Sequence, residues 1–296
     1  MTSSPSAAAA AAAALSLLLP LSACVTVDVG ENAFFYPRAL LADGERIEVI
    51  ASDGTPLVGR LLRVLRPRAT LIFFNGNADL LELSGKRLHK YASFGFNVVT
   101  VNYRGYGESG GSLSVDTLKS DSLAVYQAVA RRDDLNTRHV LLYGLSLGGF
   151  AACYVATHAA VDALVLESAE TTVPQVLSAW TPWYGRPFVR FRIAGALQDA
   201  DNLSALSSYR GPLLILSGRA DRVAPPAFAA ALYAASRSAD KQLVSVDAGH
   251  NDVPDAPQFD AAFEAFATRL FGPADASPGG SLHAQLPGSP RLQPVP

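Results

Sequence analysis

The chain has 296 residues, of which 49% are hydrophobic and 17% are charged, and it carries a formal net charge of -2 with a pI near 6.2. This length suits one large α/β domain, and the apolar content excludes a disordered chain. From the near-neutral charge we expect neither a basic face nor a nucleic-acid partner.

The amino-terminal segment has the pattern of a secretion signal. Residues 7–21 form an apolar run of fifteen residues, which is shorter than the about 20 residues of a membrane span and typical of a signal peptide. The sequence LSAC, ending at Cys24, resembles the lipobox of bacterial lipoproteins, although no Lys or Arg precedes the apolar run. We expect residues 1–23 to be a lipoprotein-type signal peptide, with an uncleaved signal anchor as one alternative.

The resemblance to a lipobox implies a lipid on Cys24 and hence a protein attached to a membrane of the bacterial cell envelope. A secreted or periplasmic protein without an anchor is the alternative. Cys153, the second of two cysteines, lies in an apolar stretch and is expected to be a buried thiol.

Residues 24–44 are expected to be a linker that leads into a domain at 45–271. The runs ERIEVI and PLVGRLLRVL alternate around Asp53-Gly54, which predicts an antiparallel hairpin. Six later runs are rich in β-branched and aliphatic residues and lack alternation, which predicts strands covered on both faces. These runs are ATLIFFN, FNVVTVNY, RHVLLYG, ALVLES, PLLILSG and QLVSVD.

Segments with helical spacing separate most of these runs. They are residues 80–94, 115–130, 147–158, 227–236 and 259–270. Because strand and helix alternate, we predict an α/β fold with a mostly parallel sheet flanked by helices in three layers.

Residues 169–211 interrupt this alternation, because they show no clear strand and are rich in aromatic residues. We expect a small cap insertion over the carboxyl edge of the sheet, unless these aromatics simply pack on the domain surface. They are Trp180, Trp183, Tyr184, Phe188 and Phe191. Residues 272–296, rich in Pro, Gly and Ser, are expected to be a disordered tail.

Ser146 stands between Gly144 and Gly148 in the pattern G-x-S-x-G, after a predicted strand and before a predicted helix. This context is typical of a nucleophilic serine on a sharp turn. A neutral hydroxyl is a weak nucleophile, so it needs an imidazole to accept its proton and a carboxylate to orient that imidazole.

His250 is the best candidate for the imidazole, because it follows the last predicted strand at the edge where open α/β sheets build their sites. Asp221, in SGRADRVAP, falls between the serine and the histidine in chain order, as expected for this type of hydrolase. Glu167 is the rival acid. The other histidines fall on predicted helices, at a strand start or in the tail: His89, His158, His139 and His283.

A tetrahedral intermediate also needs two N–H donors for its negative oxygen. We assign one to Leu147, directly after the serine, and the other to Asn77, in the loop FFNGNADL after a predicted strand. The histidines show no metal-ligand spacing, so we expect neither a metal nor a cofactor.

Five motifs occur in a fixed order: NGNADL, NYRGYGESGGSLS, YGLSLGG, SGRADRVAP and GHND. Through them the chain resembles serine hydrolases of the α/β-hydrolase fold, most of all the depalmitoylase-like branch. The resemblance implies an eight-stranded sheet and a catalytic triad, carried onto Ser146, Asp221 and His250. Asn75 departs from the pattern, because family members usually have histidine there.

We therefore predict a serine hydrolase that cleaves carboxylic esters or thioesters through an acyl-enzyme, with an apolar acyl or aryl substrate suggested by the aromatic cap. An aminopeptidase or amidase on the same triad is an alternative. The G-x-G-x-x-G at 105–110 could indicate a dinucleotide-binding enzyme, but residues 111–114 delay the following helix. A lipid-anchored binding module without catalysis is the other alternative.

Overall fold

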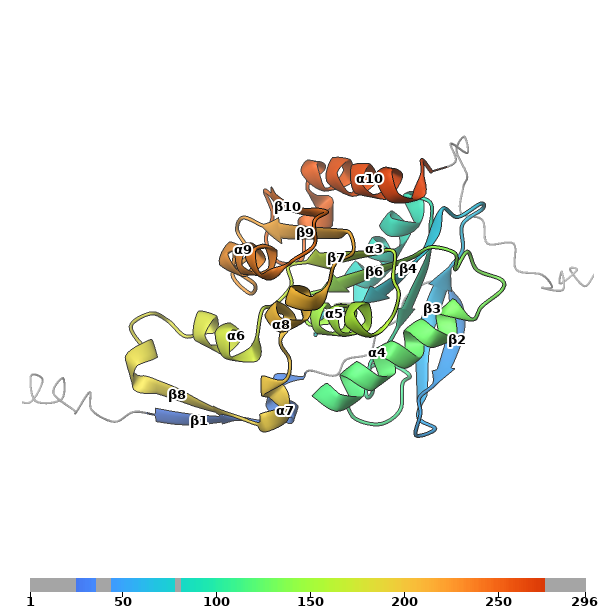
Figure 1. Ribbon diagram of the computed structural model, residues 1–296. Helices are drawn as coiled ribbons and strands as arrows, with labels where there is room; N and C mark the ends of the chain where they lie inside the picture. The colour runs from blue at the N-terminus through green and yellow to red at the C-terminus, as the bar shows by residue number, and fades with distance from the viewer. Residues whose placement is uncertain (1–24, 36–43, 78–80, 275–296) are drawn as a thin grey trace, which may run out of the picture.

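The computed structural model describes residues 25–35, 44–77 and 81–274. An eight-stranded sheet forms its centre (Figure 1). The strands are β2 (Glu45–Ile50), β3 (Pro56–Leu62), β4 (Ala69–Phe74), β5 (Phe96–Val101), β6 (Val140–Leu145), β7 (Ala163–Glu167), β9 (Leu213–Gly218) and β10 (Lys241–Val246). Their order across the sheet is β10-β9-β7-β6-β4-β5-β3-β2.

The strand directions confirm the predicted mostly parallel sheet. β3 pairs antiparallel with β2 and β5, and every other pairing in this sheet is parallel. β4, β5, β6, β7 and β9 are buried along their whole length, which explains their continuous apolar runs. β2 lies at the edge and alternates between exposed and buried residues, as its sequence predicted.

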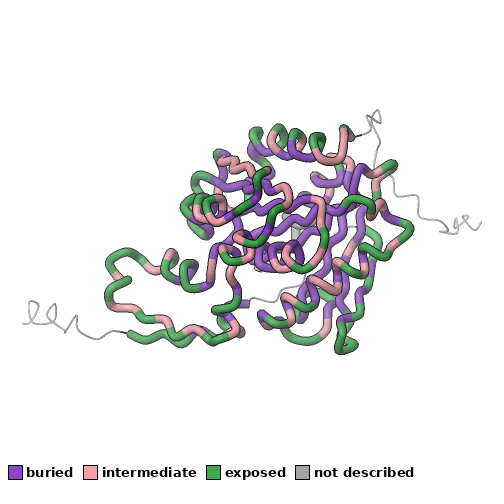
Figure 2. The backbone as a smooth tube through the Cα atoms, in the orientation of Figure 1, coloured by how far each residue is buried: buried purple, intermediate pink, exposed green. Residues whose placement is uncertain are grey.

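Helices cover both faces of the sheet. α3 (Leu81–Ser93) and α10 (Pro257–Phe271) pack on one face through a cluster that includes Tyr91 and Phe263. α4 (Val115–Ala130), α5 (Gly148–His158) and α9 (Pro226–Ala235) pack on the other face, where Leu118, Val155 and Leu232 are buried. Figure 2 shows the sheet as a buried layer between mixed helical surfaces.

The start of α4 decides between two interpretations of the glycine-rich loop at 105–110. Ser114 caps the helix: its side chain accepts a hydrogen bond from the Thr117 N–H, and the Thr117 side chain accepts one from the Ser114 N–H. The helix therefore begins at Val115, after the glycines rather than on them. A dinucleotide site needs glycines that open the helix, so this loop lacks the required context.

The insertion at 169–211 contains a strand, so the expectation that it has none is wrong. Its elements are α6 (Val173–Trp180), a short 3-10 helix η1 (Arg186–Phe188), β8 (Val189–Ile193), α7 (Gly195–Gln198) and α8 (Asn202–Ser208). β8 pairs in parallel with β1 (Val25–Val29), and the two strands project beside α6 (Figure 1). The segment at 24–44, expected to be a linker, thus holds β1 and the helical turn α2 (Glu31–Phe34).

The sequences of β1 and β8 do contain a pattern typical of strands, because VTVDV and VRFRI alternate apolar and polar residues with a period of two. Each run is short, and its partner lies far away in the chain, so no hairpin turn marked the pairing.

Several expectations concern residues outside the described ranges. They include the signal peptide at 1–23, the lipidation of Cys24, His283, and the tail beyond residue 274. Within the described ranges, no helix is both long and apolar enough to cross a membrane. Cys153 is buried as expected, and burial raises the pKa of its thiol.

Arg104 ties the hairpin turn to helix α4. Its guanidinium lies 2.7 Å from the carboxylate of Asp121 and 2.6 Å from that of Asp53. The side chains of Arg104 and Asp121 are each only 8% exposed. A buried ion pair of this kind is costly to break, because removing one partner leaves the other charge without compensation.

Replacing Arg104 with Met should lower the free energy of unfolding by about 3 to 5 kcal/mol, because Asp121 would be left buried and unpaired. Arg46→Met is the matched control, because the pairs that Arg46 forms with Glu48 and Glu108 are exposed. This substitution should cost about 0 to 1 kcal/mol. Urea unfolding of both variants measures the difference. Equal losses would contradict the role given to Arg104.

Candidate active site

Ser146 lies in a strained turn between β6 and α5. Its φ is 51°, in the left-handed region that few residues other than glycine adopt. A Cβ added at Gly148 would lie 2.1 Å from the Phe74 carbonyl oxygen, and one at Gly144 would lie 2.6 Å from the Gly148 oxygen. The two flanking glycines are therefore required by close backbone packing, as a nucleophilic turn requires.

The structure brings Ser146, His250 and Asp221 into one hydrogen-bonded chain. His250 Nε2 lies 3.1 Å from Ser146 Oγ, and His250 Nδ1 lies 2.8 Å from Asp221 Oδ2. The three residues follow β6, β10 and β9, whose carboxyl ends meet at one edge of the parallel sheet. An ionised carboxylate only accepts hydrogen bonds, so Nδ1 donates to Asp221 and Nε2 is left to accept from the serine hydroxyl.

The backbone around Asp221 holds its carboxylate in place. Oδ1 accepts hydrogen bonds of 2.8 Å from the N–H groups of both Val223 and Ala224. The side chain is fully buried. One carboxylate oxygen is thus held by the backbone, and the other is directed at His250.

Glu167, the rival acid, has other partners. Its carboxylate pairs with Arg87 at 2.7 Å and accepts hydrogen bonds from the hydroxyls of Tyr91 and Tyr143. Among the other histidines, His139 lies 3.1 Å from Asp162 at the surface and His158 stacks on Tyr154, while His89 lies on α3. The structure therefore joins His250 to Asp221 rather than to Glu167.

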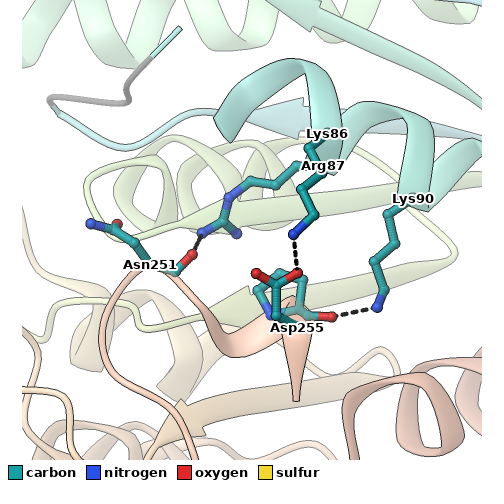
Figure 3. Close-up of a pocket in the computed structure, with 6 residues that line it drawn as sticks. Lys86, Arg87, Lys90, Asn251 and Asp255 are labelled. Atoms are coloured by element: carbon teal, nitrogen blue, oxygen red, sulfur yellow. Dashed lines mark hydrogen bonds and ion pairs between the residues drawn. The ribbon is translucent and has the colours of Figure 1, made fainter. Parts of the chain in front are cut away.

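Helix α3 fastens the loop that carries His250. Figure 3 shows Arg87 donating to the Asn251 carbonyl, Lys86 paired with Asp255, and Lys90 donating to the carbonyl of Pro254. The Lys86 pair spans 2.7 Å. Arg87 also holds Glu167, so one buried guanidinium connects α3, the end of β7 and the histidine loop.

The loop after β4 lies beside the serine. A Cβ added at Gly76 would be 3.7 Å from the Cβ of Ser146. The Asn77 side chain is fixed from both ends: its oxygen accepts from the Tyr106 hydroxyl at 2.7 Å, and its nitrogen donates to the Phe34 carbonyl at 2.6 Å. The predicted oxyanion loop is therefore next to the nucleophile and held by side-chain hydrogen bonds.

Asn75 and Leu147 complete this corner of the site. The Asn75 side chain donates a hydrogen bond to the Thr100 hydroxyl at 2.7 Å, and the backbone carbonyl of Asn75 accepts one from the Tyr103 hydroxyl at 2.8 Å. The asparagine that departs from the family pattern thus holds the loop to β5 and to the segment after it. Leu147 is the N-cap residue of α5, and within the described residues its N–H has no hydrogen-bond acceptor.

Glu170 is a site residue that sequence reasoning missed. Its side chain is 3% exposed, and its Oε2 has no hydrogen-bond partner among the described residues. Burial raises the pKa of Glu170 to about 7, while the nearby His250 and Ser146 lower it. The available signal was its position three residues after β7, at the same sheet edge as the serine and histidine.

These observations define the class of protein, which is the α/β-hydrolase fold. Residues 66–210 match the family described as serine aminopeptidase, S33. The uncharacterized protein YfhR of Salmonella typhi is 29% identical over 246 residues, which cover 76% of this chain and 82% of YfhR. The protein bem46 of Schizosaccharomyces pombe is 29% identical over 226 residues, covering 73% of this chain and 74% of bem46.

Solved structures share the architecture. An esterase of Pyrococcus furiosus aligns with a TM-score of 0.61 at 16% identity, over 80% of this chain and 100% of that chain. An esterase domain from a Rhodothermus marinus protein aligns with a TM-score of 0.60 at 22% identity, over 77% and 99%. At this identity the likeness shows the fold alone, and the fold together with the family match supports a hydrolase.

No group of three or more His, Cys, Asp or Glu side chains within the described ranges is arranged to hold a metal ion.

The titration of Glu170 should be visible in protein stability. Its pKa of about 7 exceeds the ordinary 4.5, so the folded protein keeps a proton that the unfolded chain releases between these values. The free energy of unfolding should therefore fall by about 2 to 3 kcal/mol as the pH rises from about 5 to about 8. Glu170→Gln should remove this fall, which urea unfolding across the pH range measures.

Glu108→Gln is the control for this measurement. Arg60 and Arg46 hold the pKa of Glu108 below its usual value, so this carboxylate stays ionised across the same pH range in both states. Wild type and this control should therefore show the same slope. A wild-type slope that Glu170→Gln leaves unchanged would contradict the titration of Glu170.

Proposed function

We propose that the protein is a serine hydrolase that cleaves carboxylic ester or thioester bonds through an acyl-enzyme intermediate. The observation that carries the proposal is the hydrogen-bonded chain from Ser146 through His250 to Asp221, with contacts of 3.1 and 2.8 Å. A hydroxyl, an imidazole and a carboxylate in this order are the parts of a general-base-activated nucleophile.

In the first half of the reaction, Ser146 Oγ attacks the substrate carbonyl carbon while His250 Nε2 takes its proton. The carbonyl oxygen becomes negative and accepts hydrogen bonds from the N–H groups of Leu147 and Asn77. The intermediate then collapses and the bond to the leaving group breaks. The leaving alcohol or thiol takes the proton from His250, and the acyl group stays on Ser146.

In the second half, water attacks the acyl carbon and gives a proton to His250. Collapse of this second intermediate releases the carboxylic acid and returns the proton to Ser146. Asp221 orients the imidazole throughout and stabilises its positive charge. The two N–H groups that hold its other oxygen keep the carboxylate aimed at His250.

The ordered motifs favour the depalmitoylase-like branch, and a lipid on Cys24 would keep the enzyme at a membrane of the bacterial cell envelope. A second candidate reaction is cleavage of an amide bond next to a free amino group, which the match to the serine aminopeptidase family favours. The same triad serves both reactions, because the acyl-enzyme chemistry is shared.

The triad should act as a unit. Ser146→Ala and His250→Ala should each lower kcat by about 10⁴-fold or more, and the double variant should be little worse than either single one. Rates on p-nitrophenyl butyrate measure this. A fluorophosphonate probe should label the wild-type protein and fail to label Ser146→Ala. The mechanism would be contradicted if the loss of kcat in the double variant were the product of the two single losses, or if Ser146→Ala were still labelled. A binding module without catalysis would not be labelled at all.

The cap supplies a test of substrate preference. Trp180 of α6 donates from its indole nitrogen to the Val223 carbonyl at 3.0 Å, so the cap is attached directly to the loop that carries Asp221. Val176 of the same helix is buried against Phe228. We propose that this apolar helix, which contacts the Asp221 loop, favours longer acyl chains, because each methylene that is buried adds to binding.

We expect kcat/KM to rise from p-nitrophenyl acetate to the octanoate, and Trp180→Ala to reduce this preference by about tenfold. Trp183→Ser is the control, since Trp183 is 79% exposed at the outer end of the cap and should leave the preference unchanged. A preference for acetate that Trp180→Ala does not alter would count against an apolar acyl substrate.

A further inference from the structure

The ribbon formed by β1 and β8 has two chemically different faces. The register places Val25 opposite Val189 and Val27 opposite Phe191, while Thr26 lies opposite Arg190 and Asp28 opposite Arg192. Neighbouring residues of a strand point to opposite faces. One face of the ribbon is therefore apolar, and the other is polar and basic.

Among the described residues, the body of the protein covers the inner end of the apolar face and leaves its outer end exposed. Val29 is 8% exposed, and Phe191 and Ile193 pack against the main core cluster. At the outer end, Val25 is 56% exposed and Val27 is 39% exposed. Figure 2 shows this end as exposed surface. The apolar face thus continues past the region where the protein covers it.

Two aromatic side chains lie near the same outer end. Trp183 and Tyr184 are 79% and 66% exposed, and their rings contact each other edge to face with centroids 5.9 Å apart. They lie just before η1, which leads directly into Val189, the partner of Val25. Trp and Tyr are the residues that favour the boundary between lipid and water.

The charge of this end is positive. Arg186 and Arg190 are exposed there. Arg192 lies further along β8, where it faces Asp28 of β1 at 3.2 Å. The two arginines at the outer end favour an anionic surface over a neutral one.

The chain itself indicates what this surface meets. Val25, the first residue of β1, directly follows Cys24, the cysteine of the lipobox-like sequence. A lipid on Cys24 would enter the bilayer at the outer end of the ribbon, beside the exposed aromatic and basic residues.

We propose that the outer end of the cap, formed by Val25, Val27, Trp183, Tyr184, Arg186 and Arg190, is a docking surface for an anionic phospholipid bilayer. The ribbon meets the bilayer end-on, because the valines and Arg190 lie on opposite faces of it. The aromatic rings and valines enter the interfacial layer, and the arginines contact lipid phosphates. This surface adds a second attachment to the lipid anchor and orients the cap toward the membrane. The inference concerns binding alone, so it holds whether or not the proposed esterase activity is correct.

The test uses the chain from residue 24 onward with Cys24→Ser, which keeps every described residue and removes the lipid anchor. Flotation with vesicles of phosphatidylglycerol and phosphatidylethanolamine measures binding, and vesicles of phosphatidylcholine give the neutral comparison. We expect binding to the anionic vesicles. The pair Trp183→Ser and Tyr184→Ser should lower the partition coefficient by about tenfold or more, and Arg190→Glu by about fivefold.

Leu65→Ser is the matched control, because Leu65 is 88% exposed in the turn between β3 and β4, outside the cap. It should bind as wild type does. Circular dichroism and thermal unfolding report folding of each variant independently of catalysis, and rates on a soluble ester should not change in the tip variants. If the wild-type chain binds vesicles but does not hydrolyse esters, the proposed function is refuted and this inference stands.

Three outcomes would overturn the proposal. The wild-type chain would fail to float with anionic vesicles, or the tip variants would float as well as wild type. Alternatively, sedimentation equilibrium would show a dimer that the same tip variants abolish, which would make the surface an interface between two copies of this chain.

Discussion

Close backbone packing at the serine turn is the constraint on which the site depends. Without side chains at Gly144 and Gly148, α5 can begin against the end of β4, with a backbone approach that a single Cβ would block. This approach holds Ser146 at a positive φ and places the loop after β4 beside it. The nucleophile, the Leu147 N–H and the neighbouring loop therefore meet at one point, and the parallel sheet brings His250 and Asp221 to the same edge.

Three buried carboxyl groups lie at this edge, and their surroundings give them different properties. Asp221 is held by His250 and two backbone N–H groups, which fix the direction of its carboxylate. Glu167 is neutralised by Arg87 and serves to connect α3 to the sheet. Glu170 Oε2 has no hydrogen-bond partner among the described residues, and burial raises the pKa of Glu170 to about 7. The same functional group thus has three roles: Asp221 orients the imidazole, Glu167 holds the structure together, and Glu170 titrates.

The cap also divides into two parts. Its inner helix, α6, packs on the loop that carries Asp221, through Trp180 and Val176. Its outer end is a ribbon whose second strand comes from the start of the described chain. The pairing of β1 with β8 therefore connects the first described residues of the chain with the insertion whose helix α6 contacts the Asp221 loop.

Local patterns were sufficient to locate the eight strands of the main sheet, five of its helices and the turn at Ser146, because periodicity and turn residues act over a few positions. They also indicated that His250 and Asp221 follow neighbouring strands. They failed for β1 and β8, whose pairing depends on residues far apart in the chain. They also failed for Glu170, because its raised pKa results from burial in the folded protein. The choice between Glu167 and Asp221 likewise needed the folded chain, because only distance shows which carboxylate reaches the imidazole. The sequence by itself determined the strands, the helices and the residue types at the site, because these depend on neighbouring residues. Burial and proximity were decided by the tertiary structure, because they arise when distant segments pack together.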